Sequence, residues 1–136
     1  DATAHVNSDT VQELNAPKRI LIVDDNRDNA QSLALMLELM GQITCVAHDG
    51  LEAISEGERF RPDVILMDIG MPRLNGYDAC GRIRQTPWGQ GIVMIAQTGW
   101  GQEHDHARAI AAGFDTHLTK PVTPESLAQA FSGSKP

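Results

Sequence analysis

The sequence predicts an α/β fold: a doubly wound, five-stranded parallel sheet with helices on both faces. Short apolar runs alternate with helical stretches from residue 18 to about residue 132. The clearest run, at 20–23, is continuous and rich in β-branched residues, as expected for a strand buried on both faces of a sheet. Five such runs, each followed by a helical stretch, favour parallel strands joined by right-handed helical crossovers.

The first half of the chain contains two predicted strands and two predicted helices. After the strand at 20–23, apolar residues recur on one helical face over 26–40, and a glycine follows. The residues predicted to face the sheet are Ala30, Leu33, Ala34 and Leu37. A second strand is predicted at 42–47. Asp49 and Glu52 then have the spacing of a capping box, which predicts a helix that ends near residue 60.

The second half continues the alternation with three strands and three helices. Strands are predicted at 64–67, 92–96 and, more weakly, 114–118, and helices at 77–84 and up to residue 112. Gly113 supplies the stop of the second of these helices. Thr123 and Pro124 are typical of the cap and the first position of a last helix, which would face the core with Leu127 and Phe131.

Bulk properties indicate one globular domain and exclude several functions. The 136 residues suit a single domain at 18–132, with a linker or tag at 1–17 and a tail at 133–136. No apolar run approaches the roughly 20 residues that cross a bilayer, and no secretory signal is recognisable, so we expect a cytoplasmic domain without membrane contact. The net charge of −7 and the scattered Lys and Arg argue against direct nucleic-acid binding.

Polar residues follow four of the five predicted strands. Asp24 and Asp25 follow the first strand, and the others are Asp68, Thr98 and Lys120, after the third, fourth and fifth strands. Each alone is as readily a helix cap, a turn residue or a surface charge. Because ligand sites of doubly wound sheets lie beyond the carboxyl ends of the strands, we expect these side chains to form one cluster.

The charges of this cluster predict a cation site and phosphoryl chemistry. Three carboxylates and one ammonium leave a net charge of −2, which one Mg²⁺ (or Mn²⁺) ion would balance with the oxygen ligands that it prefers. We predict Asp25 and Asp68 as direct ligands and Asp24 as a ligand through water. A carboxylate can accept a phosphoryl group, so Asp68 is the predicted nucleophile, with Lys120 neutralising charge and Thr98 donating to a phosphoryl oxygen.

Five motifs in order make the chain from about 18 to 131 resemble the receiver domain of two-component signalling. They are Val23-Asp24-Asp25-Asn26, Leu66-Met67-Asp68-Ile69-Gly70-Met71-Pro72, Asn75-Gly76, Ala96-Gln97-Thr98-Gly99 and Leu118-Thr119-Lys120-Pro121. The resemblance implies the flavodoxin-like strand order 2-1-3-4-5, a cis peptide between Lys120 and Pro121, and the backbone carbonyl of Gly70 as a further metal ligand.

The resemblance also implies partners and a switch. Asp68 would accept its phosphoryl group from a histidine kinase or a histidine phosphotransfer protein, without the domain being an enzyme itself. Phosphorylation would draw the Thr98 hydroxyl inward, and His117 occupies the position where relatives carry a switching aromatic residue. The output surface would be the fourth helix, the fifth strand and the fifth helix. The parent protein would be a hybrid sensor histidine kinase or a single-domain response regulator, and dimerisation stays open.

The first predicted helix also carries an unexpected apolar patch. Leu35 and Leu39 fall opposite its sheet-facing side, with Met36 at the flank. Exposed leucines are common, but an apolar patch beside the acceptor edge is where a phosphodonor helix could dock. We expect this patch to be a docking site.

Three alternatives belong to other functional classes. A pseudo-receiver would act by binding alone, although the acidic set is complete. A haloacid-dehalogenase-like phosphohydrolase would carry its nucleophile in an Asp-x-Asp motif on the first strand, whereas this chain has adjacent Asp24 and Asp25 and a separate Asp68. A dinucleotide-binding domain is excluded because no Gly-x-Gly-x-x-Gly follows the first strand.

Overall fold

The computed structural model describes residues 17–71, 74–99 and 106–133. Strands and helices alternate along the chain, as predicted. The elements are β1 (Arg19–Val23), α2 (Arg27–Leu39), β2 (Ile43–Ala47), α3 (Gly50–Phe60), β3 (Val64–Asp68), α4 (Gly76–Arg84), β4 (Val93–Thr98), α5 (His106–Ala112), β5 (Thr116–Thr119) and α6 (Pro124–Gly133).

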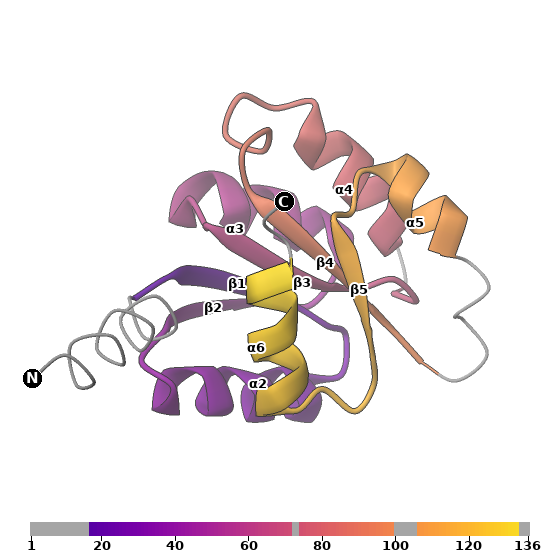
Figure 1. The fold of residues 1–136 in the computed structure, drawn as a ribbon. Coiled ribbons are helices and arrows are strands. Elements are labelled where there is room, and N and C mark those ends of the chain that lie inside the picture. The colour runs from indigo at the N-terminus through magenta and orange to yellow at the C-terminus, as the bar shows by residue number, and fades with distance from the viewer. Residues whose placement is uncertain (1–16, 72–73, 100–105, 134–136) are drawn as a thin grey trace, which may run out of the picture.

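The strands form one parallel sheet in the order β2-β1-β3-β4-β5, which confirms the predicted fold class and strand order. Figure 1 shows α2 and α6 on one face of the sheet and α3, α4 and α5 on the other. The chain order reverses between β1 and β3, so the carboxyl ends of these two strands border the crevice where such sheets bind ligands.

Side-chain caps begin four of the described helices. At α6 the predicted cap Thr123 accepts a hydrogen bond of 3.1 Å from the amide of Ser126. Asn26 accepts a hydrogen bond from the Asn29 amide at the start of α2, and Asn75 does the same for α4 with the amide of Asp78. The predicted capping box begins α3: Asp49 accepts from the Glu52 amide. The Glu52 carboxylate accepts from the amide of His48, one residue before the cap. Each cap is worth about 1 kcal/mol.

The sheet separates two apolar layers. The predicted inner face of α2 is confirmed, because all four of its residues are buried, and they pack with Ile20, Ile22 and Leu127. The other face of the sheet packs against α3, α4 and α5 in a larger cluster that includes Leu21 and Met67. The side chain of Phe131 lies outside the described residues.

Two strands differ from the prediction by two residues. β4 continues to Thr98, because its polar end is still paired: Gln97 lies opposite Asp68, and Thr98 lies opposite Thr119. β5 starts at Thr116 instead of residue 114. Phe114 is buried in the connection before it, and its amide bonds to the carbonyl of Ala109. Apolar content alone therefore ended β4 two residues too early and started β5 two residues too early.

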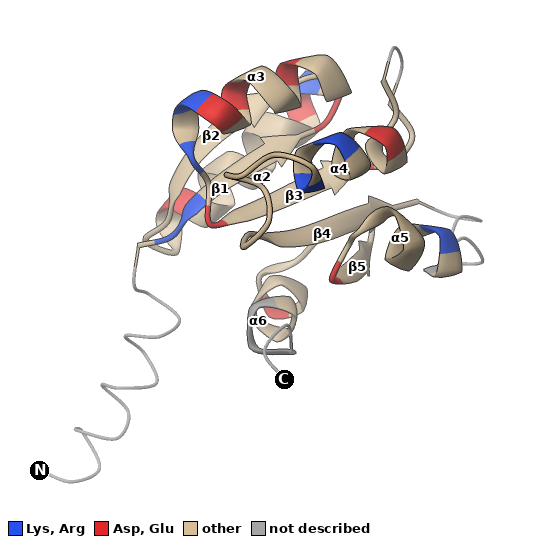
Figure 2. Ribbon diagram, turned by 90° about the horizontal axis from the view of Figure 1, so that it is seen from above, with Lys and Arg blue, Asp and Glu red and all other residues tan. Residues whose placement is uncertain are grey.

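The charged residues on the helices are mixed in sign. On α3 and α4, basic residues stand among acidic ones, so neither helix presents a uniformly basic surface (Figure 2). No helix within the described ranges is long and apolar enough to cross a membrane.

Both cysteines are free thiols, and burial raises the pKa of Cys80 to about 12. Cys45 is only half-buried because β2 is an edge strand.

Candidate functional site

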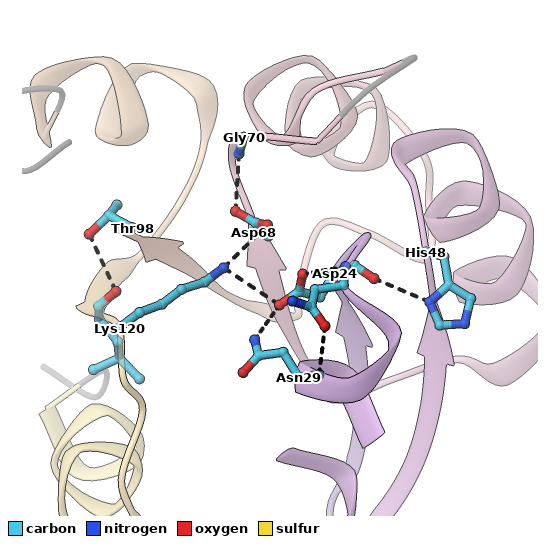
Figure 3. Close-up of polar contacts among 9 residues, drawn as sticks. Asp24, Asn29, His48, Asp68, Gly70, Thr98 and Lys120 are labelled. Carbon is cyan, nitrogen blue, oxygen red and sulfur yellow. Dashed lines mark hydrogen bonds and ion pairs between the residues drawn. The ribbon is translucent and has the colours of Figure 1, made fainter. Parts of the chain in front are cut away.

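The structure brings the predicted polar residues together at the carboxyl edge of the sheet (Figure 3). Asp24 and Asp25 directly follow β1, and Asp68 ends β3. One carboxylate oxygen from each of these three residues lies within 4.8 Å of the others. Lys120 follows β5, and its Nζ lies 3.3 Å from Oδ2 of Asp68 and 3.6 Å from Oδ2 of Asp24. Three separate strands therefore build one charged cluster.

Asp24 is the buried anchor of this cluster. Its side chain is 0% exposed. Its Oδ1 accepts a hydrogen bond of 2.9 Å from the Asn26 amide, and its Oδ2 accepts from Nδ2 of Asn29 and faces Lys120. A buried carboxylate needs such partners, because burying an unpaired charge is very costly. Asp25, one residue further along, is exposed.

Asp68 is nearly buried, and its carboxylate oxygens have different partners. Oδ1 accepts a 3.1 Å hydrogen bond from the amide of Gly70, and Oδ2 faces Lys120. Burial raises the pKa of Asp68, and the charge of Asp24 raises it further. The Gly70 amide and Lys120 pull the same pKa down, but the net direction is upward. Within the described residues, the three carboxylates of the cluster also outnumber the one ammonium group that faces them, that of Lys120.

Thr98 lies at the end of β4 with its hydroxyl directed away from Asp68. Its Oγ1 donates a hydrogen bond of 3.4 Å to the carbonyl of Leu118, and its carbonyl accepts from the amide of Lys120 at 2.8 Å. His117 lies on β5 opposite Ala96 and is half-buried. The predicted switch residues thus occupy neighbouring strands, and their role stays a prediction.

The donor set of the cluster fits a small divalent cation. Three carboxylates offer hard oxygen ligands within the reach of one ion, and Asp25 is accessible from solvent. Gly70 is exposed beside Asp68, with its amide turned toward that side chain. The predicted cis peptide between Lys120 and Pro121 is confirmed.

Sequence reasoning missed three polar residues around the site. Asn29 supports Asp24 from the first turn of α2, and His48 places Nδ1 at 3.2 Å from the backbone carbonyl of Asp24. His48 reaches this carbonyl because the chain after β2 passes beside the end of β1. Gln97 is fully buried on β4. An amide in an otherwise apolar strand was the available signal for Gln97, whereas nothing in the sequence distinguishes Asn29.

The predicted docking residues lie along α2, as expected for their spacing. Leu35 is 58% exposed and Leu39 is 81% exposed, and Met36 is half-buried beside them. The two leucines are among the most exposed large apolar side chains of the described residues. An apolar patch of this kind is typical of a protein interaction site.

Fold and site together define a doubly wound α/β domain with a cluster of three carboxylates at its topological switch point. The family model of the response regulator receiver domain matches residues 20–132. The chain therefore belongs to the response regulator receiver family, which is a family of signalling domains of two-component systems.

Two curated relatives show how far the similarity extends. An uncharacterized 14.6 kDa protein in the sodA1 3′ region of Leptolyngbya boryana is 41% identical over 108 residues, which are 79% of this chain and 82% of that protein. The response regulator MprA of Mycobacterium ulcerans is 36% identical over 109 residues, 80% of this chain. The match spans only 46% of MprA.

Two solved structures are similar in fold. The receiver domain of the sensor histidine kinase PA1611 of Pseudomonas aeruginosa, with a magnesium ion coordinated in its active-site cleft, has a TM-score of 0.78 and 32% identity, covering 86% of this chain and 96% of that one. The receiver domain of Ssk1 of Saccharomyces cerevisiae, solved with the histidine phosphotransfer protein Ypd1, has a TM-score of 0.77 and 25% identity, covering 85% and 87%.

Proposed function

We propose that this domain accepts a phosphoryl group on Asp68 from a phosphohistidine donor, with a bound divalent cation. The observation that carries the proposal is the convergence of three carboxylates and Lys120 at the carboxyl edge of the sheet. The magnesium ion in the cleft of the similar PA1611 receiver supports the cation. A binding-only pseudo-receiver would not need this complete set of charges.

The transfer moves one phosphoryl group between two side chains. An oxygen of Asp68 forms the new P–O bond while the P–N bond to the donor histidine breaks, and the imidazole nitrogen keeps the electron pair and is protonated from solvent. Lys120, already 3.3 Å from Oδ2 of Asp68, neutralises charge on the phosphoryl oxygens. The cation would supply further positive charge for the same oxygens.

The contacts of the acidic residues support the predicted division of roles at the metal. Oxygens of Asp24 already accept hydrogen bonds from Asn26 and Asn29, and Oδ2 faces Lys120, which suits a ligand that acts through water. Asp25 is exposed, and one of its carboxylate oxygens lies within 4.8 Å of an oxygen of Asp68, so these two carboxylates are the proposed direct ligands. The backbone carbonyl of Gly70 is the third proposed protein ligand.

Thr98 and His117 are the proposed switch. In the structure the Thr98 hydroxyl donates to the carbonyl of Leu118, and this is a weak bond of 3.4 Å. A phosphoryl oxygen on Asp68 is a stronger, charged acceptor, so phosphorylation would draw the hydroxyl toward the site. His117 would then move on β5 and change the surface that α5, β5 and α6 form.

Acetyl phosphate labelling tests the function directly. We expect labelling of the wild-type chain that requires Mg²⁺, and no labelling of Asp68→Asn, because an amide cannot form the acyl phosphate. Intact mass spectrometry measures the added phosphoryl group. Asp63→Asn is the matched control, since Asp63 lies at the other end of β3 and is exposed. Labelling of Asp68→Asn would show that another residue is the acceptor.

We further propose that the phosphodonor, a histidine kinase or a phosphotransfer protein, docks on the apolar patch of α2. The complex of the similar Ssk1 receiver with Ypd1 supports a partner of this class. We propose that the parent protein is a hybrid sensor histidine kinase or a single-domain regulator. The similar receiver domain of the sensor histidine kinase PA1611 supports the first of these contexts.

Replacing Leu35 and Leu39 with Ala tests the docking proposal. The double variant loses exposed apolar surface, so it should keep its stability but slow transfer from a phosphohistidine donor by about 10-fold or more. Labelling by acetyl phosphate should be unchanged. Leu51→Ala, which truncates an exposed leucine on α3, is the control. Equal loss with both donors would contradict a docking role.

A further inference from the structure

A small cavity opens beside the acceptor cluster, between α2 and the connection from β5 to α6. Its volume is about 130 Å³. Polar lining comes from Asn29, Ser32, Gln97 and Lys120. An apolar wall comes from Leu33 and Met36 of α2 and from Pro121 and Val122 of the connection. The cavity therefore combines hydrogen-bonding groups with an aliphatic lining.

Gln97 is the unusual member of this lining. Its side chain is fully buried, and neither Oε1 nor Nε2 has a hydrogen-bond partner among the described residues. Leaving a buried amide unpaired costs about 1–3 kcal/mol, so such a group is normally satisfied in the functioning protein. Both the donor and the acceptor of Gln97 lack a partner among the described residues, so one group that offers an acceptor and a donor side by side would satisfy the whole amide.

The position of Gln97 ties the cavity to the acceptor. In the sheet, Gln97 of β4 lies between Asp68 of β3 and Leu118 of β5. Lys120, which faces both Asp68 and Asp24, lines the same cavity. A group bound in the cavity would therefore lie next to the residue that accepts the phosphoryl group.

The volume of the cavity and its place beside the apolar patch of α2 indicate what kind of group it would bind. About 130 Å³ is below the 300–1,000 Å³ of typical small-molecule pockets and close to the roughly 150 Å³ that holds one benzene molecule. It therefore suits a single side chain better than a free metabolite. Met36 belongs both to this cavity and to the apolar patch of α2, so a partner docked on the patch would cover the cavity.

We propose that the cavity receives one primary carboxamide, the side chain of an Asn or Gln of the docked phosphodonor, paired with Gln97. The inference rests on the proposed docking of a donor on α2. An amide pairs with an amide through one N–H···O bond in each direction, and its aliphatic stem fits the apolar wall. The contact would hold the donor in one register beside Asp68.

The chemistry of the cavity can be tested without a donor. The probes are isobutyramide and N,N-dimethylacetamide, which are isomers, and only the first has N–H donors. We expect isobutyramide to shift the side-chain amide resonances of Gln97 in ¹⁵N-labelled wild-type protein, saturably and at millimolar concentration. N,N-dimethylacetamide should bind at least about 10-fold more weakly. No saturable shift, or equal shifts with both isomers, would overturn the carboxamide assignment.

Gln97→Met tests the role in transfer, because it removes the amide and keeps an unbranched side chain. Replacing an unpaired buried amide with an apolar group is neutral or stabilising, so the variant should fold. Its backbone ¹⁵N resonances should no longer respond to isobutyramide. Transfer from the phosphohistidine donor should slow about 10-fold, with acetyl phosphate labelling unchanged. Unchanged transfer from the donor would exclude a partner side chain as the occupant.

These outcomes separate the inference from the function on which it rests. If acetyl phosphate fails to label wild-type Asp68, the phosphoacceptor function is wrong, whatever the amide titration shows. If labelling succeeds and the titration fails, only the carboxamide subsite is wrong.

Discussion

Replacing Lys120 with Met is expected to reduce acetyl phosphate labelling of Asp68 by about 100-fold or more. The ammonium lies 3.3 Å from Oδ2 of Asp68 and is the charge that stabilises the transferring phosphoryl oxygens in the proposed reaction. Preorganised positive charge at a partly buried site has effects of this size, because no solvent reorganisation is needed when the reaction occurs. Labelling is measured by intact mass in saturating Mg²⁺.

The same substitution should destabilise the metal-free domain by about 2 kcal/mol, measured by urea unfolding. It leaves the buried carboxylate of Asp24 and the nearly buried one of Asp68 without their cation. The effect should fall below the full cost of breaking a buried ion pair, because the Lys120 side chain is 31% exposed.

The loss of stability should also depend on pH. Burial already raises the pKa of Asp68, and Lys120 is one of the groups that lower it, so the variant should have a still higher pKa at this residue. A carboxyl group whose native pKa is raised binds protons more tightly in the folded chain than in the unfolded one. Stability therefore falls as pH rises between the two pKa values.

The deficit of Lys120→Met should accordingly be largest at neutral pH and shrink as the pH is lowered through the carboxyl range. Urea unfolding at about pH 7 and about pH 4.5 measures it. Lys18→Met is the control, since Lys18 precedes β1 at the opposite edge of the sheet. A deficit that is equal at both pH values would contradict the electrostatic explanation.

Gly76→Ala should destabilise the domain by roughly 2–3 kcal/mol and weaken phosphorylation as well. A Cβ at Gly76 would lie 2.6 Å from the Cα of Ile69 and 2.7 Å from the carbonyl oxygen of Asp68. Both are backbone atoms, so the clash cannot be relieved by a side-chain rotation. The start of α4 would have to move away from the end of β3, which carries Asp68.

Gly81→Ala is the matched control in the same helix. Nothing lies within 4 Å of a Cβ at Gly81, so the added methyl group meets open space. Alanine is the better helix former, and this variant should be more stable by about 0.5–1 kcal/mol. Thermal unfolding and acetyl phosphate labelling of both variants check the pair. Similar effects at the two positions would show that close packing against the backbone of Asp68 and Ile69 is not the cause.

Local pattern was sufficient for most of the elements. The apolar residues of α2 and the Asp49 cap of α3 were predictable because helical spacing and capping act within a few residues. The ends of β4 and β5 were predicted wrongly because strand pairing continues through polar residues such as Gln97 when both neighbours are present.

The polar residues of the candidate site were also predictable, because each stands at the carboxyl end of a strand or just after it, and parallel strands end at one edge. Asp24, Asp25, Asp68, Thr98 and Lys120 follow from that rule alone. The strand order was known beforehand only from the family resemblance, since short apolar runs do not say which strands are neighbours.

By itself, then, the sequence determined the class of fold, the polar residues at the carboxyl edge of the sheet and the surplus negative charge from which we predict a cation. Only the tertiary structure decided that Asn29 and His48 support Asp24, that the Thr98 hydroxyl is directed to β5, and that Gln97 is buried without a described partner. Those facts depend on side chains from different elements meeting in space. Local periodicity carries information about neighbours a few residues apart, whereas these contacts join residues brought together by the packing of α2, β4 and β5 around the end of the sheet.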